Sequence, residues 1–157
     1  LRRSRRRPDL LFILGPGFTR RDELEHIMAS YDGSWTLHAS PEQVAPLLGS
    51  ADVALLAGGR TVYEAAVLGL TGIVIPSIEH ERPVAEALAA RDAFFQLPWT
   101  PDMPEEAFEE KLLDLLDRLL SGGSLRERMS LNARSLVDGR GRLRVARIIR
   151  DTGRSMS

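Results

Sequence analysis

The segment 51–76 constrains the fold most, because its pattern is that of a strand, a glycine loop, a helix, a glycine stop and a second strand. Residues 53–57 are a short apolar run, typical of a strand that is buried on both faces of a sheet. A Gly-Gly pair follows at once, and an apolar-periodic helix then runs from Thr61 until Gly69 ends it. A strand–helix–strand unit of this kind predicts parallel strands joined by a crossover.

The same alternation of strand and helix patterns extends over most of the chain. We expect strands at 10–14, 34–37, 53–57, 73–75 and 93–97. We expect helices at 20–30, 41–48, 61–68, 81–90, 105–120, 124–137 and 143–150, and a turn at 138–141. The helix at 105–120 has an apolar stripe, formed by Phe108, Leu112, Leu115, Leu116 and Leu119. Ser40 is expected to cap the second helix, with Pro41 at its first position. This order predicts an α/β fold with a Rossmann-like, doubly wound parallel sheet and extra C-terminal helices.

Composition narrows the class of protein. The 157 residues are 43% hydrophobic and 27% charged, which is typical of a globular domain. The net charge of -1 argues against general nucleic-acid binding, and the absence of cysteine excludes disulfides, thiol nucleophiles and cysteine-based zinc sites. No apolar run reaches the roughly 20 residues of a membrane span, and no signal-peptide pattern is found. We therefore expect a cytoplasmic protein.

The N-terminal residues resemble the end of an interdomain linker. An arginine-rich run, 2–7, leads to Pro8, and the first expected strand follows. We expect residues 1–8 to be a linker remnant, 9–152 to form the domain and 153–157 to be a disordered tail. The chain is then a piece of a longer protein, although a processed or tagged N-terminus is the alternative.

Three loops follow predicted strands at their carboxyl ends, where parallel sheets bind ligands. These loops lie at 15–17, 58–61 and 76–82, and we expect them to converge on one crevice. The glycine pair at 58–59 precedes a helix, so free N–H groups and the positive end of the helix dipole suit a phosphate. Arg60 is the side chain best placed to pair with that phosphate, although a solvated loop arginine is equally compatible.

Other known site patterns are absent from the sequence. Gly15-Pro16-Gly17 starts like a dinucleotide fingerprint, but Arg20 stands at the third glycine position. There is no P-loop, no zincin motif at His80-Glu81 and no nucleophile elbow. We accordingly expect neither a metal nor a cofactor.

Thr61 and Glu64 have two interpretations. Their spacing is that of a capping box, in which the threonine and the glutamate satisfy the first backbone groups of the helix. In the other interpretation, Glu64 accepts hydrogen bonds from a ribose diol while the helix start holds phosphate. His80 is compatible with an exposed loop histidine, and Glu81 with an ordinary acidic residue at a helix start.

These motifs resemble the C-terminal domain of GT-B glycosyltransferases and their relatives, over residues 1–150. The likeness is greatest to the UDP-sugar hydrolase of pseudaminic acid synthesis and the spore-coat polysaccharide proteins, and more distant to the peptidoglycan N-acetylglucosaminyltransferase. The matching segments are 14–17, 51–52, 58–64, 68–71, 75–81 and 138–144. Pro16, Phe18, Thr71 and the run 79–81 depart from the hydrolase pattern.

The resemblance implies roles for individual residues. Diphosphate binding falls to Gly58, Gly59, Arg60 and Thr61. Gly15 and Gly17 are also expected to bind the substrate. Glu64 is expected to hold the ribose. His80 and Glu81 are expected to lie near the sugar.

The resemblance also implies a function: the donor half of a glycosyltransferase or UDP-sugar hydrolase in surface polysaccharide or glycan biosynthesis. The general base is then expected in an N-terminal domain of the same protein, and this chain alone is expected to bind nucleotide weakly without turnover. Two alternatives stay open. One is a degenerate, non-catalytic module for docking or oligomerisation, and the other is a sugar-phosphate binder without a base pocket.

Overall fold

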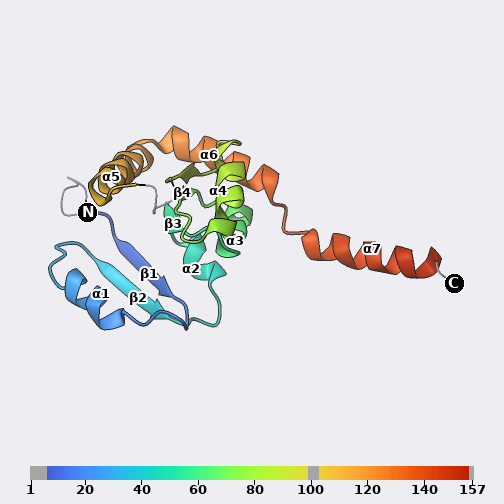
Figure 1. The fold of residues 1–157 in the computed structure, drawn as a ribbon, viewed down its shortest axis with the longest axis horizontal. Helices are drawn as coiled ribbons and strands as arrows, with labels where there is room; N and C mark the ends of the chain where they lie inside the picture. Colours follow the sequence, from blue (N-terminus) through green and yellow to red (C-terminus); the bar gives the residue numbers. More distant parts are fainter. Residues whose placement is uncertain (1–6, 99–102, 156–157) are drawn as a thin grey trace. The chain divides into compact units, whose positions relative to one another are not determined.

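The computed structural model describes residues 7–98 and 103–155 (Figure 1). The chain divides into two compact units, residues 1–51 and residues 52–157. The linker expected at 1–8 and the tail expected at 153–157 fall partly outside the described residues, and the domain limits 9–152 stay a prediction. No helix of the described ranges is both long and apolar enough to cross a membrane.

The first unit is built on one parallel strand pair. Its elements are β1 (Leu10–Leu14), α1 (Arg21–Met28), β2 (Trp35–Ala39) and α2 (Ala45–Gly49). Leu10 pairs with Trp35 and Leu14 with Ala39, so the register is unbroken along both strands. The rings of Phe12 and Trp35 pack edge to face with their centroids 6.4 Å apart.

The predicted cap at Ser40 is wrong. Helix α2 begins at Ala45, its N-cap residue is Val44, and no side chain caps it. Ser40 instead donates its backbone N–H to the carbonyl of Leu14 at 2.8 Å and has a positive φ of 48°. This backbone hydrogen bond extends the pairing of β1 and β2 by one residue. Ser40 therefore lies at the end of a strand and not at the start of a helix.

The second unit continues the alternation of strands and helices. Its elements up to the sheet edge are β3 (Ala54–Leu56), α3 (Thr61–Leu68), β4 (Gly72–Val74), the 3-10 turn η1 (Glu79–Glu81), α4 (Arg82–Ala89) and β5 (Phe95–Gln96). Three helices follow: α5 (Glu105–Ser121), α6 (Gly123–Leu136) and α7 (Gly141–Ser155). The strands are ordered β3-β4-β5 and every pairing is parallel. The predicted α/β class is confirmed, and α7 extends beyond the expected end at residue 150.

Gly69 ends α3 as predicted, with a left-handed φ of 75°. A side chain on Gly69 would also have no room, because its Cβ would lie 2.1 Å from Nε of Arg134. Arg134 belongs to α6 and donates from Nη2 to the carbonyl of Leu68 at 2.8 Å. A cation at a helix C-terminus is favourable, so α6 provides the polar end cap of α3.

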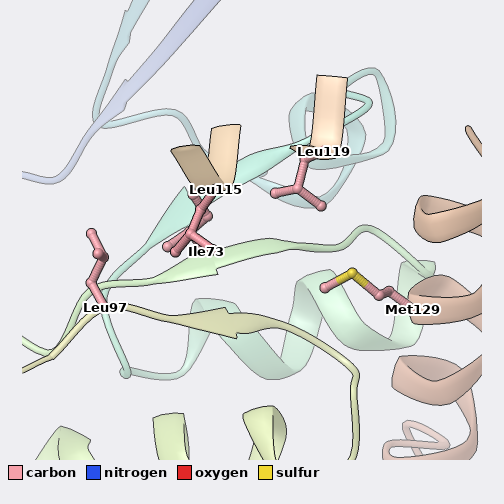
Figure 2. Close-up of a cluster of buried hydrophobic side chains, with 5 residues drawn as sticks. All are labelled: Ile73, Leu97, Leu115, Leu119 and Met129. Atoms are coloured by element: carbon pink, nitrogen blue, oxygen red, sulfur yellow. The ribbon is translucent and has the colours of Figure 1, made fainter. Parts of the chain in front are cut away.

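The core of the second unit lies between its sheet and the C-terminal helices (Figure 2). The buried cluster consists of Ile73, Leu97, Leu115, Leu119 and Met129. The predicted apolar stripe of α5 supplies two of these residues, and its other members pack against the cluster while partly buried: Phe108, Leu112 and Leu116. Helices α5 and α6 therefore contribute side chains to the hydrophobic core of the second unit.

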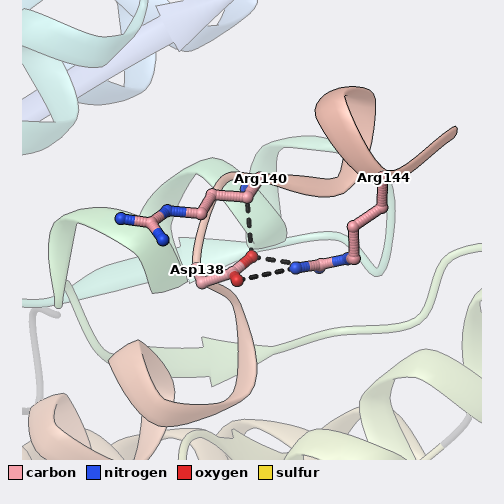
Figure 3. A network of polar contacts seen from close by, with 3 residues as sticks. All are labelled: Asp138, Arg140 and Arg144. Atoms are coloured by element: carbon pink, nitrogen blue, oxygen red, sulfur yellow. Dashed lines mark hydrogen bonds and ion pairs between the residues drawn. The ribbon is translucent and has the colours of Figure 1, made fainter. Parts of the chain in front are cut away.

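The segment between α6 and α7 is a turn, as the Asp-Gly-Arg-Gly sequence predicts, and an ion pair closes it (Figure 3). Asp138 accepts the backbone N–H of Arg140 at 2.9 Å and two N–H groups of Arg144 at 2.7 and 3.0 Å. The Arg144 guanidinium, followed by the Arg140 N–H, lowers the pKa of the Asp138 carboxyl to about 2. Gly139 has a φ of 69°, which explains the glycine within the turn.

Truncating the core at Leu119 should destabilise the second unit. Leu119 is fully buried, so Leu119→Ala is expected to lower the free energy of unfolding by about 2 to 5 kcal/mol. Leu131→Ala is the matched control, because Leu131 on α6 is 65% exposed. Urea unfolding followed by circular dichroism measures both, and equal effects of the two variants would show that α5 is not part of the core.

The turn at Asp138 should be sensitive to acid. Because the pKa of Asp138 is lowered in the folded chain, its stabilising pairs are present at neutral pH and are lost as the pH falls from about 4 to about 2. Arg144→Ala should raise the pKa of Asp138 toward its ordinary value, measured by a carboxyl NMR titration. Arg142→Ala removes an exposed arginine of the same helix turn and should leave that pKa unchanged.

Candidate functional site

The predicted phosphate loop lies between β3 and α3. Gly58 is buried, Gly59 is half-buried and Arg60 is exposed. Arg60 is the N-cap residue, it already has helical backbone angles, and no side chain caps the helix. Thr61 is therefore the first residue of the helix, and the capping-box interpretation of Thr61 and Glu64 is wrong.

The start of α3 leaves backbone N–H groups available to a ligand. The N–H groups of Val62 and Tyr63 donate to the carbonyls of Gly59 and Arg60 at 3.4 and 3.0 Å. Within the described residues, the backbone N–H groups of residues 59–61 make no hydrogen bond. Three such N–H groups at the positive end of a helix dipole can bind an anion.

Glu81 is buried beside this loop rather than exposed to a ligand. It is only 6% exposed, and its Oε2 accepts the backbone N–H of Ser77 at 2.8 Å and the Ser77 hydroxyl at 2.9 Å. Burial tends to raise the pKa of this carboxyl, but hydrogen bonds from Ser77, Ile78 and Gly58 outweigh it and hold the pKa below its usual value. Glu81 is thus an ionised carboxylate held by backbone donors.

The contact with Glu81 also explains Gly58. A Cβ on Gly58 would lie 2.6 Å from Cβ of Glu81 and 2.7 Å from its carbonyl oxygen. Only glycine allows the loop 58–61 and the segment 76–81 to pack this closely. The sequence interpretation assigned the glycine pair to ligand access alone and missed this packing role, because the contact partner lies 23 residues further along the chain.

The remaining candidate residues are exposed. Arg60, Glu64 and His80 have exposed side chains, and within the described ranges none of them has an ion pair or a side-chain hydrogen bond. Glu64 lies on α3, one turn after the available N–H groups. These three side chains are accessible to a ligand of the loop.

Gly15 and Gly17 belong to the first unit. They are exposed, and open space surrounds the position where each would carry a Cβ. A tight turn joins them, in which the N–H of Phe18 donates to the carbonyl of Gly15 at 3.1 Å. The structure brings together the two loops of the second unit, and the expected convergence with the loop at 15–17 stays a prediction.

Among the described residues, no group of three or more histidine, aspartate or glutamate side chains could hold a metal ion. The candidate site itself presents backbone N–H groups, the guanidinium of Arg60, the carboxylate of Glu64 and the imidazole of His80.

Comparison with known proteins supports the resemblance to GT-B enzymes. No family model matches the chain. It is similar to the spore coat polysaccharide biosynthesis protein SpsG of Bacillus subtilis (strain 168), with 27% identity over 143 residues. That match covers 91% of this chain and 41% of SpsG, in the C-terminal part of SpsG. The chain thus spans less than half the length of this relative.

Solved structures share the fold. MurG of Acinetobacter baumannii superposes with a TM-score of 0.71 at 21% identity, over 91% of this chain and 41% of MurG. The glycosyltransferase VinC, solved in complex with dTDP, superposes with a TM-score of 0.53 at 23% identity, over 88% of this chain and 39% of VinC. Both are GT-B glycosyltransferases. The chain therefore has the fold of a GT-B glycosyltransferase domain and resembles the C-terminal part of SpsG.

Proposed function

We propose that this chain is the donor-site half of a glycosyltransferase or UDP-sugar hydrolase of surface polysaccharide or glycan biosynthesis. The observation that carries the proposal is the set of available N–H groups of residues 59–61 at the start of α3. The similarity to SpsG, named for spore coat polysaccharide biosynthesis, and the fold shared with VinC, solved with dTDP, agree with it.

The diphosphate is proposed to lie against the start of α3. Its oxygens would accept the N–H groups of Gly59, Arg60 and Thr61, and the exposed guanidinium of Arg60 would add a charge-assisted contact. Negative charge develops on a leaving nucleoside diphosphate as the sugar–phosphate bond breaks. Fixed N–H dipoles at that position would stabilise this charge without a large reorganisation.

Glu64 is proposed to hold the ribose. Its carboxylate is exposed and lies one turn beyond the proposed diphosphate site. Because Thr61 is not the capping residue, Glu64 has no capping role to satisfy, and a carboxylate can accept two hydroxyl hydrogen bonds. His80 is proposed to face the sugar, and Gly15 and Gly17 are proposed to bind the substrate as well.

The catalytic base is proposed to come from another part of the same protein. The chain matches only 41% of SpsG, and the resemblance to GT-B enzymes implies a base in the N-terminal domain. We therefore expect this chain alone to bind a UDP-sugar weakly and not to turn it over. The proposed partners are the nucleotide sugar and an N-terminal domain, and the proposed location is the cytoplasm.

A second candidate function is a non-catalytic docking module. The observation that favours it is the set of exposed apolar side chains on α7: Leu143, Val145, Ile148 and Ile149. A helix with such a face is suited to contact a partner. In this case the N–H groups at the start of α3 would be solvated and would have no ligand.

Calorimetric titration with UDP, beside ADP, GDP and pyrophosphate, tests the proposal. We expect saturable UDP binding, and Glu64→Ala should weaken it about tenfold or more, because hydrogen bonds to a charged group contribute about 1.5 to 3 kcal/mol. Pyrophosphate binding should be the same for the wild type and Glu64→Ala. The control Glu86→Ala removes an exposed carboxylate from α4 and should change neither affinity.

Two results would contradict the proposal. If the folded chain binds none of the four ligands, the docking module becomes the leading function. If pyrophosphate binds as tightly as UDP, the site recognises a phosphate group and has no pocket for the base.

A further inference from the structure

We infer that Glu81 is a positioning residue: its buried carboxylate ties the segment 76–81 to the loop 58–61 and so presets the N–H groups of residues 59–61 for one anion. This inference rests on the proposed function and deepens it. It gives Glu81 a role different from the sugar contact that the family resemblance implies.

One carboxylate oxygen of Glu81 is hydrogen-bonded within the segment 76–81. Oε2 accepts both the backbone N–H and the hydroxyl of Ser77, at 2.8 and 2.9 Å. These two bonds span four residues and fold the segment after β4 into a tight turn that leads into η1. The two bonds from Ser77 therefore hold the Glu81 carboxylate in one orientation.

The rest of the Glu81 side chain faces the glycine loop. Oε1 lies 3.6 Å from the position of a Cβ on Gly59, and Cβ of Glu81 lies 2.6 Å from that of a Cβ on Gly58. The backbone N–H of Gly58 is also near enough to this carboxylate to help lower its pKa. The N–H groups left for a ligand therefore begin at Gly59.

The donors around Glu81 require a carboxylate rather than an amide. The backbone N–H and the hydroxyl of Ser77 donate to Oε2, and the backbone N–H groups of Ile78 and Gly58 help to lower the pKa of this carboxyl. A buried carboxylate accepts several such bonds, whereas an amide would replace one acceptor by an NH2 group that meets other donors. Glu81→Gln retains the volume of the side chain, so it removes the tie without creating a cavity.

The test compares wild type, Glu81→Gln and the control Glu86→Gln in the full chain. Calorimetry measures the affinities for UDP and UMP, and their ratio reports the contribution of the second phosphate. We expect Glu81→Gln to lower this ratio about fivefold or more, since charge-assisted bonds preset the loop. A loss of folded protein alone would weaken both ligands equally and leave the ratio unchanged. Glu86→Gln should also leave it unchanged.

A second readout needs no ligand. In an amide NMR spectrum, the Gly58 and Ser77 N–H signals should move upfield in Glu81→Gln, while the Ala66 amide in the middle of α3 should not move. Unchanged signals for Gly58 and Ser77, or an unchanged UDP-to-UMP ratio, would overturn the inference. Ser77→Ala removes only the hydroxyl donor. It should change the UDP-to-UMP ratio and the Gly58 amide signal in the same direction but by less. This variant replaces Glu81→Gln in the test if Glu81→Gln does not fold.

The two proposals fail in different ways. A wild-type chain that binds neither UDP nor pyrophosphate overturns the proposed function and the ligand part of this inference. The Gly58 and Ser77 amide signals then decide by themselves whether Glu81 ties the two loops together.

Discussion

The charge of Glu81 in the interior of the second unit is the constraint on which both of its site loops depend. A carboxylate that is 6% exposed is tolerated only if donors surround it, and Gly58, Ser77 and Ile78 provide them from two loops. If the loop 58–61 moved away, the carboxylate would keep only the donors of its own segment, Ser77 and Ile78. The ends of β3 and β4 are therefore held together by electrostatics as well as by their parallel pairing.

The sequence correctly predicted those elements whose local hydrophobic pattern favours the same structure as their packing in the fold. The strand–helix–strand unit from 53 to 75, the left-handed stop at Gly69 and the apolar stripe of α5 were all predicted, because each follows from its own sequence. Ser40 was misassigned because serine and proline favour a helix start, whereas the bond from its N–H to Leu14 extends a ladder that involves residues far away in sequence.

The candidate site was only partly predictable for the same reason. The glycine pair correctly located a loop with available N–H groups before α3, since that geometry is local. The role that depends on a tertiary contact was not predicted: Glu81 faces Gly58. The spacing of Thr61 and Glu64 left two interpretations open, and Thr61 lies inside the first turn instead of capping it. A buried acid at the start of a helix has the same local sequence pattern as an exposed one, so only the fold could distinguish them.

The contact of Arg134 with the end of α3 has a consequence for cooperativity. Helix α3 is held at its first turn by the loop that Glu81 organises and at its last turn by a guanidinium from α6. Local opening of α6 removes this cap from the C-terminus of α3, so the stabilities of the two helices are coupled. A ligand that binds only the folded form of the loop 58–61 stabilises α3. Binding is then expected to slow hydrogen exchange in α6, although α6 contributes no residue to the proposed site.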